Sequence, residues 1–456
     1  MGKYFGTDGI RGYAGRELTC KIAYKIGRFL GWHLSKDKEK PRALIGKDTR
    51  LSCDMLEYGI IAGLLEGGAN AYMLGVTTTP SVSYLVEKQG FDLGIMISAS
   101  HNPYYDNGIK LLNEKGEKLG DEITDKIEAY LDNDIAFLGL NCDLSRATGE
   151  KIGRAIPYNE GADTYINHLI SMSPSSLDGL KIGIDLANGS GYRIGKAVFE
   201  GLGANITVIN DTPNGININE NAGSTHIEGL RELVKKEGLD FGFALDGDGD
   251  RCICVDKNGE IIDGDHILYI LARELQANGE LYNNTVVLTV MSNLGLINAF
   301  NENGIKTKIT DVGDRFVYEE MVKGKYSLGG EQSGHIILSK YANTGDGILT
   351  AIMVASCLAK HQVALTDLCK NLTLYPQITV SLPVKNKATI LENNLVKKEI
   401  ERAKLRLDMM GRLIVRPSGT ENKIRITVEA PNHRECDEII EALTTIIYSE
   451  DNNGNT

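Results

Sequence analysis

The chain has 456 residues, which at roughly 150 residues per domain predicts about three domains with cores of ordinary size. Its 49 lysines and arginines against 61 aspartates and glutamates give a net charge of −12 without any basic block, which argues against nucleic acid or an anionic membrane as a partner. No apolar run is long enough to span a bilayer, the N-terminus lacks the layout of a signal peptide, and the eight cysteines form no C-x-x-C pair. We therefore expect a globular protein of the reducing cytoplasm.

Through its first three quarters the chain repeats one pattern three times: strand, helix, glycine-marked turn, strand, helix, strand. The first strands are expected at 42–47, 181–185 and 285–289. The joints from helix to second strand are expected at 65–73, 200–208 and 303–309. The third strands are expected at 92–98, 240–245 and 326–329. Short apolar strands that alternate with helices are typical of right-handed βαβ units in parallel or mixed sheets.

The last part of the chain has a different pattern. We expect a strand at 377–382, a charged helix at about 391–405, strands at 412–415 and 423–429, and a closing helix at about 434–447. The predicted fold class is α/β, with three similar α/β mixed-sheet domains plus a smaller C-terminal α+β domain around a central cleft. The predicted domains are residues 1–152, 153–252, 253–368 and 369–456.

A short polar loop follows each of the three third strands. These loops lie at about 98–103, 246–251 and 330–335. In α/β sheets, ligands bind outside the carboxyl ends of the strands. The three loops occupy equivalent positions, so they could face one shared cleft.

The second loop, Asp-Gly-Asp-Gly-Asp-Arg, predicts a metal site. Its side chains alternate in direction and its glycines allow tight turning, so Asp246, Asp248 and Asp250 can converge on one point. Three converging carboxylates repel each other unless a cation lies among them, and oxygen ligands suit a hard ion such as Mg²⁺. A calcium EF-hand loop needs Gly at its sixth position and Glu at its twelfth, where this chain has Arg251 and Lys257. An ordinary acidic turn remains the alternative, because Asp-Gly is common turn chemistry.

The first loop offers groups for phosphoryl transfer. The hydroxyl of Ser100 can carry a phosphoryl group if a metal neutralises the charge and an acid/base handles the proton. His101 lies beside it, and Lys110 is a candidate proton handler if burial or neighbouring charge lowers its pKa. Ser-Ala-Ser is equally compatible with a helix cap or a turn, His101 with a structural role, and Lys110 with a solvated surface position.

Two further loops carry candidate binding groups. In the third loop, Glu331, Ser333 and His335 present short polar groups between glycines, as polyol recognition requires, although an ordinary turn would use the same residues. The turn from Arg416 to Thr420 combines a guanidinium, hydroxyls and free N–H groups, as phosphate binding requires, while Pro-Ser-Gly also suits a hairpin.

One glycine-rich stretch imitates a nucleotide site. Asn188-Gly-Ser-Gly191 follows a strand, and Gly195 lies in the helix after it. The spacing is G-x-G-x-x-x-G instead of the G-x-G-x-x-G of dinucleotide-binding units, so we expect no nucleotide here.

Together the loops resemble those of the α-D-phosphohexomutase superfamily over essentially the whole chain. The resemblance rests on four motifs, at 4–12, 97–110, 311–315 and 329–335. Gln332 in the last motif is typical of the amino-sugar branch, whereas the phosphoglucomutase/phosphomannomutase branch usually has Met.

The resemblance implies a role for each candidate. Ser100 would be the phosphoserine, and Mg²⁺ would bridge it to Asp246, Asp248 and Asp250, with Arg251 alongside. Arg11 and Lys110 would flank the reacting oxygen, with Lys110 and His101 as the acid/base contributors. The sugar would be bound by Glu331, Ser333 and His335. The phosphate that is not reacting would be bound by Arg416, Ser418, Gly419 and Thr420, with Arg425 nearby.

The implied reaction converts glucosamine 6-phosphate to glucosamine 1-phosphate through a bound 1,6-bisphosphate, which also primes the enzyme. It would feed the synthesis of UDP-N-acetylglucosamine and of cell-wall precursors in the cytoplasm. The expected partner is a small sugar phosphate, with no nucleic acid and no membrane, and a homodimer is possible. The alternatives are the same chemistry on glucose or mannose phosphates, a metal-dependent phosphatase, and a non-catalytic sugar-phosphate sensor.

Overall fold

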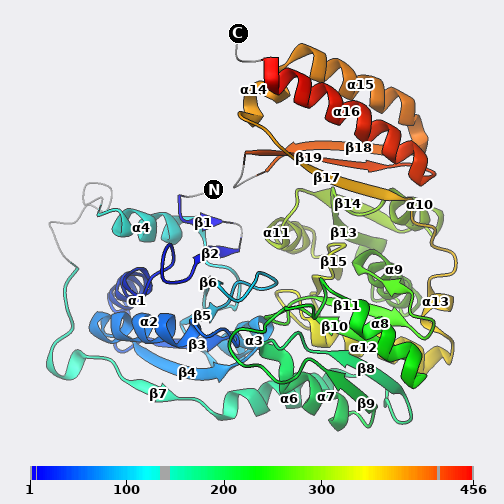
Figure 1. The fold of residues 1–456 in the computed structure, drawn as a ribbon. Coiled ribbons are helices and arrows are strands. Elements are labelled where there is room, and N and C mark those ends of the chain that lie inside the picture. The colour runs from blue at the N-terminus through cyan, green and yellow to red at the C-terminus, as the bar shows by residue number, and fades with distance from the viewer. Residues whose placement is uncertain (1–2, 7, 134–143, 419–421, 454–456) are drawn as a thin grey trace. The chain divides into compact units, whose positions relative to one another are not determined.

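The computed structural model describes residues 3–6, 8–133, 144–418 and 422–453 (Figure 1). By its internal contacts the chain divides into two compact units, Met1–Met291 with Lys306–Cys369 and Ser292–Ile305 with Lys370–Thr456. Each unit is described by itself. Among the described residues, no helix has both the length and the apolar character that crossing a membrane requires.

The first sheet of the larger unit has helices on both faces. Its strands lie in the order β1-β2-β6-β5-β3-β4-β7. Successive residues of β3 point to opposite faces, so Ala43 and Ile45 pack with α1 and α2, whereas Leu44 packs with α3. α1 and α2 lie side by side (Figure 1). The elements are β1 (Phe5–Gly6), β2 (Gly9–Tyr13), α1 (Cys20–Leu34), β3 (Arg42–Lys47), α2 (Cys53–Gly67), β4 (Asn70–Val76), α3 (Thr79–Gln89), β5 (Leu93–Ile97), β6 (Asp106–Leu112), α4 (Asp121–Leu131) and β7 (Ala155–Pro157).

The second and third sheets follow in the same unit, in the orders β12-β11-β10-β8-β9 and β14-β13-β15-β16. The elements of the second are α6 (Glu160–Met172), β8 (Lys181–Asp185), α7 (Ile194–Gly201), β9 (Asn205–Ile209), α8 (Glu228–Glu237), β10 (Phe241–Leu245), β11 (Cys252–Asp256) and β12 (Ile261–Ile262). After these come α9 (Gly264–Ala277), β13 (Thr285–Thr289), β14 (Lys306–Thr310), α11 (Asp314–Gly324), β15 (Leu328–Gly330), β16 (Ile336–Leu338), α12 (Gly347–His361) and α13 (Leu365–Leu368).

All three sheets contain the same four-strand arrangement. In each, the second, first and third strands of the repeat are parallel neighbours, and one antiparallel strand pairs with the third. The polar loops join the third strand to this antiparallel strand, at β5–β6, β10–β11 and β15–β16. The repeated unit, its mixed sheets and the α/β class are therefore confirmed. The domain boundaries stay a prediction; the sheets show only that β7 pairs with the first sheet and that β11 and β12 pair with the second.

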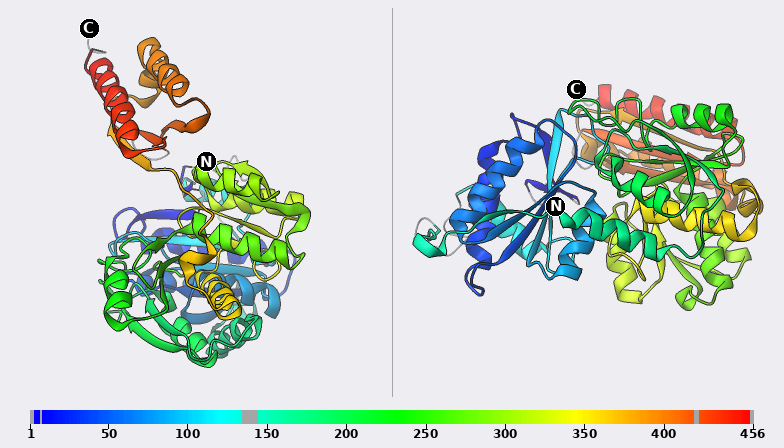
Figure 2. Two further views of the ribbon diagram at one scale, coloured as in Figure 1. Left: turned by 90° about the vertical axis from the view of Figure 1, so that its right-hand side faces the viewer. Right: turned by 90° about the horizontal axis from the view of Figure 1, so that it is seen from below.

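The smaller unit is an α+β fold, as predicted. Its antiparallel sheet has the order β17-β19-β18, and α15 and α16 pack on one face of it (Figures 1 and 2). Its elements are α10 (Leu294–Glu302), β17 (Gln377–Pro383), α14 (Lys387–Glu392), α15 (Asn394–Leu407), β18 (Arg412–Pro417), β19 (Lys423–Glu429) and α16 (His433–Asn453).

The prediction of a single helix at about 391–405 is wrong in one respect. The helix breaks at Asn393, so most of the predicted range is α15, but residues 391–392 belong to the separate helix α14. The side chain of Asn386 caps the N-terminus of α14, and that of Asn393 caps α15. Each asparagine accepts backbone N–H groups that would otherwise lack partners, so the chain can break one helix and begin another there.

Candidate active site

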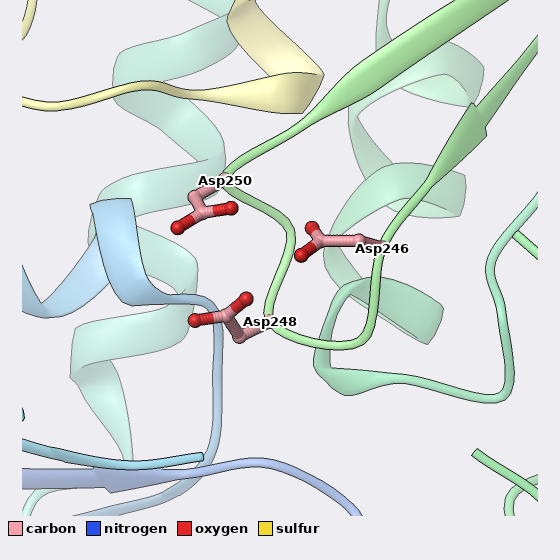
Figure 3. Close-up of side chains that lie close together, drawn as sticks. All are labelled: Asp246, Asp248 and Asp250. Carbon is pink, nitrogen blue, oxygen red and sulfur yellow. The ribbon is translucent and has the colours of Figure 1, made fainter. Parts of the chain in front are cut away.

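The three aspartates of the second loop converge, as predicted. They lie in the turn between β10 and β11, their side chains are buried and directed toward one another (Figure 3), and one oxygen from each lies within 4.8 Å of the others. Gly249 has a φ of +73°, which glycine adopts without strain. A Cβ at Gly247 would lie 2.5 Å from the carbonyl oxygen of Ser100, so glycine also permits the close approach of the two loops.

The chemistry of this cluster fits a cation. Oδ1 of Asp248 and Oδ1 of Asp250 are buried and accept no hydrogen bond from any described residue. Burial, together with the charges of Asp250 and Asp248, raises the pKa of Asp246 well above its usual value. Both observations indicate excess negative charge in the cluster. A positive ion would contact the oxygens that lack donors and would stabilise the charged form of Asp246. The triad could therefore hold a metal ion.

The first loop brings Ser100 to this cluster. Its Oγ donates a hydrogen bond of 2.5 Å to Oδ2 of Asp246, and Nδ1 of His101 lies 3.4 Å from the same Oγ. Burial and the nearby guanidiniums of Arg251 and Arg11 lower the pKa of His101 to about 4. The imidazole is therefore neutral at neutral pH and is able to accept a proton. The two loops meet at one point, although 146 residues separate Ser100 from Asp246.

Lys110 lies inside the same cluster, but its pKa moves in the direction opposite to the one considered from the sequence. Its Nζ lies 2.7 Å from Asp248, 2.9 Å from Asp8 and 3.3 Å from Asp250. Burial alone would lower the pKa of the ammonium, yet the three carboxylates outweigh this effect and raise it well above the usual value. Lys110 is thus a cation in this state, able to donate hydrogen bonds and neutralise negative charge.

Arg11 is connected to the cluster by Asp8, which pairs with both Arg11 and Lys110. One terminal nitrogen of its guanidinium donates to Asp8 at 2.6 Å, and the other lies 3.5 Å from Oδ1 of Asn102 in the serine loop. Asp8 also pairs with Lys118 at 2.9 Å, and Lys118 pairs with Asp314 at 2.6 Å.

The third loop reaches the cluster through His335. Its Nδ1 lies 3.7 Å from Oδ2 of Asp250, and its Nε2 accepts the N–H of Gly345 at 3.0 Å. As the acceptor for Gly345, Nε2 carries no proton, so the neutral ring has its proton on Nδ1, facing Asp250. Burial lowers the pKa of the ring, but the hydrogen bond to Asp250 and the charges of Asp250, Asp314 and Glu331 outweigh it and raise the pKa to about 9. Protonation of Nε2 would break the Gly345 contact. Glu331 accepts the N–H of Gly313 at 3.1 Å, and Ser333 is half-buried. All three predicted loops thus contribute to one site.

Several residues of the site were not predicted from the sequence. Thr79, at the start of α3, donates to Oδ2 of Asp248 at 2.5 Å. Asp8 lies within the motif at 4–12, three positions before Arg11, and this spacing was the only available signal. A cavity of about 370 Å³ adjoins the cluster, and its lining includes Asp8, Lys110, Lys118, Asp250, Asp314 and His335.

The glycine-rich stretch that imitates a nucleotide site packs on the metal loop. A Cβ at Gly189 would lie 2.6 Å from the carbonyl oxygen of Gly247, and the N–H of Ser190 donates to that oxygen at 2.8 Å. This packing is a structural reason for Gly189.

In the smaller unit, two of the predicted phosphate ligands face each other. Arg416 on β18 and Arg425 on β19 are directly opposed, and Nε of Arg425 is buried without a hydrogen bond to any described residue. Burial and the charge of Arg425 lower the pKa of Arg416. Like charges placed opposite each other are unfavourable, and an anion would stabilise them. Ser418 is buried beside them, whereas Gly419 and Thr420 lie outside the described residues.

Four family models cover most of the chain. They describe the α/β/α domains I, II and III and the C-terminal domain of phosphoglucomutase/phosphomannomutase, and they match residues 2–136, 163–259, 263–375 and 380–446.

Individual proteins also match over nearly the full length. The phosphoglucosamine mutase of Lachnospira eligens is 49% identical over 99% of both chains. A phosphoglucomutase/phosphomannomutase family protein from Burkholderia thailandensis has a similar fold, with a TM-score of 0.78 and 23% identity over 96% of this chain and 97% of that one. The N-acetylphosphoglucosamine mutase of Aspergillus fumigatus, solved with GlcNAc-6P and magnesium, gives a TM-score of 0.69 at 17% identity over 98% and 96%.

The chain belongs to the phosphoglucomutase/phosphomannomutase family. Within that family it belongs with the phosphoglucosamine mutases, and it is an enzyme of the isomerase class.

Proposed function

We propose that the protein interconverts glucosamine 6-phosphate and glucosamine 1-phosphate through a phosphorylated Ser100 and a bound glucosamine 1,6-bisphosphate. The observation that carries this proposal is the 2.5 Å hydrogen bond from Ser100 Oγ to Asp246, within a buried cluster of three aspartates and Lys110. A hydroxyl in contact with such a cluster can exchange a phosphoryl group, whereas an isolated serine turn could not. The similarity to phosphoglucosamine mutases supports the choice of sugar.

The reaction needs two transfers. In the first, the 1-hydroxyl of glucosamine 6-phosphate attacks the phosphorus of phosphorylated Ser100; the bond from phosphorus to Ser100 Oγ breaks and the bond to the sugar oxygen forms. The sugar hydroxyl loses its proton to a basic group, and Ser100 Oγ takes up a proton. In the second, after the bisphosphate has turned round, Ser100 Oγ loses its proton and attacks the phosphorus of the 6-phosphate. The bond from phosphorus to the sugar O6 breaks, O6 takes up a proton, and glucosamine 1-phosphate leaves while Ser100 is phosphorylated again.

The side chains around Ser100 would have different roles in the transfer according to their charge. Neutral His101, beside Oγ, can accept a proton. Cationic Lys110 can donate hydrogen bonds to the transferring group, and Arg11 and Arg251 add positive charge near it.

Asp246, Asp248 and Asp250, together with the phosphorylated Ser100, would hold Mg²⁺. The ion would supply positive charge against the phosphoryl group that is transferred. This assignment is supported by the buried oxygens that lack donors and by the preference of Mg²⁺ for carboxylate ligands.

Substrate recognition is assigned to the other two loops. Glu331, Ser333 and His335 would bind the sugar hydroxyls. Phosphate would be bound by Arg416, Ser418, Gly419, Thr420 and Arg425. We place the reaction in the cytoplasm, where it would feed the synthesis of UDP-N-acetylglucosamine. We expect a small sugar phosphate as the partner, with no nucleic acid and no membrane; homodimer formation stays a prediction.

A substrate comparison tests the proposed function. With the matching 1,6-bisphosphate as primer, turnover per active site should be highest on glucosamine 1-phosphate and lower on glucose and mannose 1-phosphates. Peptide mass spectrometry across residues 91–110 should find the phosphoryl group on Ser100. Equal or higher kcat/KM on mannose 1-phosphate would reassign the substrate, and net release of free phosphate would indicate a phosphatase.

Replacing Arg416 with alanine should raise KM for the sugar phosphate about 10-fold to 100-fold, because a charge-assisted hydrogen bond to phosphate contributes about 1.5–3 kcal/mol. The melting temperature should stay the same or rise, since the change removes the like charge opposite Arg425. Arg402, whose side chain on α15 is 80% exposed, gives a matched control in Arg402→Ala. An unchanged KM in Arg416→Ala would contradict the phosphate assignment.

A further inference from the structure

The backbone of Ser100 is held in an uncommon conformation. Its φ is +51°, in the left-handed region that residues with a Cβ seldom occupy. This conformation turns the hydroxyl toward Asp246. Such a conformation persists only when the surroundings fix it, so the contacts of the loop backbone identify the residues responsible.

One of these residues is Arg50, which follows β3. Its guanidinium is fully buried and donates to the carbonyl oxygens of Ser100 at 2.8 Å and of Asn102 at 2.9 Å. Its other terminal nitrogen donates to the carbonyls of Pro103 and Asp106. The planar guanidinium fork thus donates to four carbonyls, three in the serine loop and one at the first residue of β6, which the ammonium of a lysine could not do.

Arg50 is itself fixed in place. Its Nε donates to Oδ2 of Asp48 at 2.8 Å, and Asp48 is as fully buried as the arginine. The hydroxyl of Ser98 donates to the same Oδ2 at 2.6 Å and accepts the N–H of Ser100 at 2.9 Å. Asp48 therefore holds both Arg50, which binds the Ser100 carbonyl, and Ser98, which binds the Ser100 N–H.

The second residue is Asn219, which comes from the region of the second sheet. Its Nδ2 donates to the carbonyl of Ser100 at 2.9 Å and to that of Asn102 at 3.1 Å, the same two oxygens that Arg50 binds. Asn219 is buried, and its own N–H donates to the carbonyl of Ala187 at 2.9 Å. Arg50 holds the serine loop to its own sheet, and Asn219 holds it to the region that carries the aspartates.

We propose that Arg50 and Asn219 are positioning residues, which fix the Ser100 carbonyl so that Oγ keeps its direction toward the aspartates whether or not it carries a phosphoryl group. This inference rests on the proposed function, since it concerns the transfer to and from Ser100. Neither residue touches the reacting atoms. A loss of either should therefore lower the rate of transfer more than the binding of the sugar phosphate.

The test uses Asn219→Ala with Asn221→Ala as its matched control. Both asparagines lie in the same segment with positive φ, +58° and +50°, so alanine strains the backbone similarly at both, and Asn221 is exposed. The single-turnover rate of Ser100 phosphorylation by the 1,6-bisphosphate is measured together with kcat, KM and the melting temperature. We expect the transfer rate and kcat of Asn219→Ala to fall about 10-fold to 100-fold relative to the control, because a small misplacement of a reacting atom has effects of this size.

KM should stay within about twofold of the control, which a general loss of structure would not produce. Arg50→Lys, which keeps the charge but loses the fork, should lower the transfer rate further. Equal transfer rates in Asn219→Ala and Asn221→Ala would overturn the inference and leave the proposed function standing. A wild-type chain that accepts no phosphoryl group on Ser100 would overturn the proposed function and this inference with it.

Discussion

Replacing Ser100 with alanine is expected to lower mutase turnover by at least about 10⁴-fold, because it removes the hydroxyl that would carry the phosphoryl group covalently. In the structure Ser100 Oγ is the hydroxyl in contact with Asp246, at 2.5 Å. Turnover is measured with saturating 1,6-bisphosphate, and intact mass should show no phosphoryl group on the variant. Binding of glucosamine 6-phosphate should persist, since the predicted sugar and phosphate ligands are untouched.

A second variant separates chemistry from folding. Ser100→Gly also removes the hydroxyl, but glycine accepts the φ of +51° without strain. It should be as inactive as Ser100→Ala and more stable than it by about 1 kcal/mol in the free energy of unfolding. Detectable turnover in either variant at more than about a hundredth of the wild-type rate would exclude a phosphoserine mechanism.

The position of the site was predictable because it follows from local sequence patterns. β3, β8 and β13 have the predicted bounds, since each is a short apolar run between polar or glycine-containing segments. Alternation of strands and helices makes the central strands parallel, and parallel strands end at one edge of the sheet. The loop after each third strand was therefore identifiable as a binding loop, and the contacts of Asp246 with Ser100 and of Asp250 with His335 agree with this inference.

The electrostatic state of the site was not predictable in the same way. The pKa of Lys110 on β6 depends on Asp8, between β1 and β2, and on Asp248 and Asp250, in the β10–β11 turn. The distances among these three separate segments are set by the fold. Arg50 and Asn219 act on backbone carbonyls, which every residue has, so their partners leave no signature in the sequence. The break between α14 and α15 depends on an asparagine cap that overrides the helical pattern.

The second large effect is expected from Asp246→Asn, which should abolish Mg²⁺-dependent turnover and yet stabilise the chain when no metal is present. Burial and two neighbouring carboxylates raise the pKa of Asp246, so the folded state binds more protons than the unfolded state above the usual carboxyl pKa. The free energy of unfolding then falls as pH rises from the unfolded pKa toward the folded one. Asparagine has no such titration, so in EDTA at neutral pH the variant should have the higher melting temperature.

Adding Mg²⁺ should reverse the order of the two melting temperatures, so that the wild type becomes the more stable chain. An ion that binds only the folded wild type at 100 times its Kd stabilises it by about 2.7 kcal/mol, while Asp246→Asn, with one ligand lost, should gain much less. Asp211→Asn, a change of equal charge at a surface carboxylate paired with Lys196, should keep the full Mg²⁺-dependent shift. The same shift in Asp246→Asn as in wild type would place the ion elsewhere. A lower melting temperature for Asp246→Asn in EDTA would show that its carboxylate stabilises the metal-free fold, contrary to the electrostatic argument.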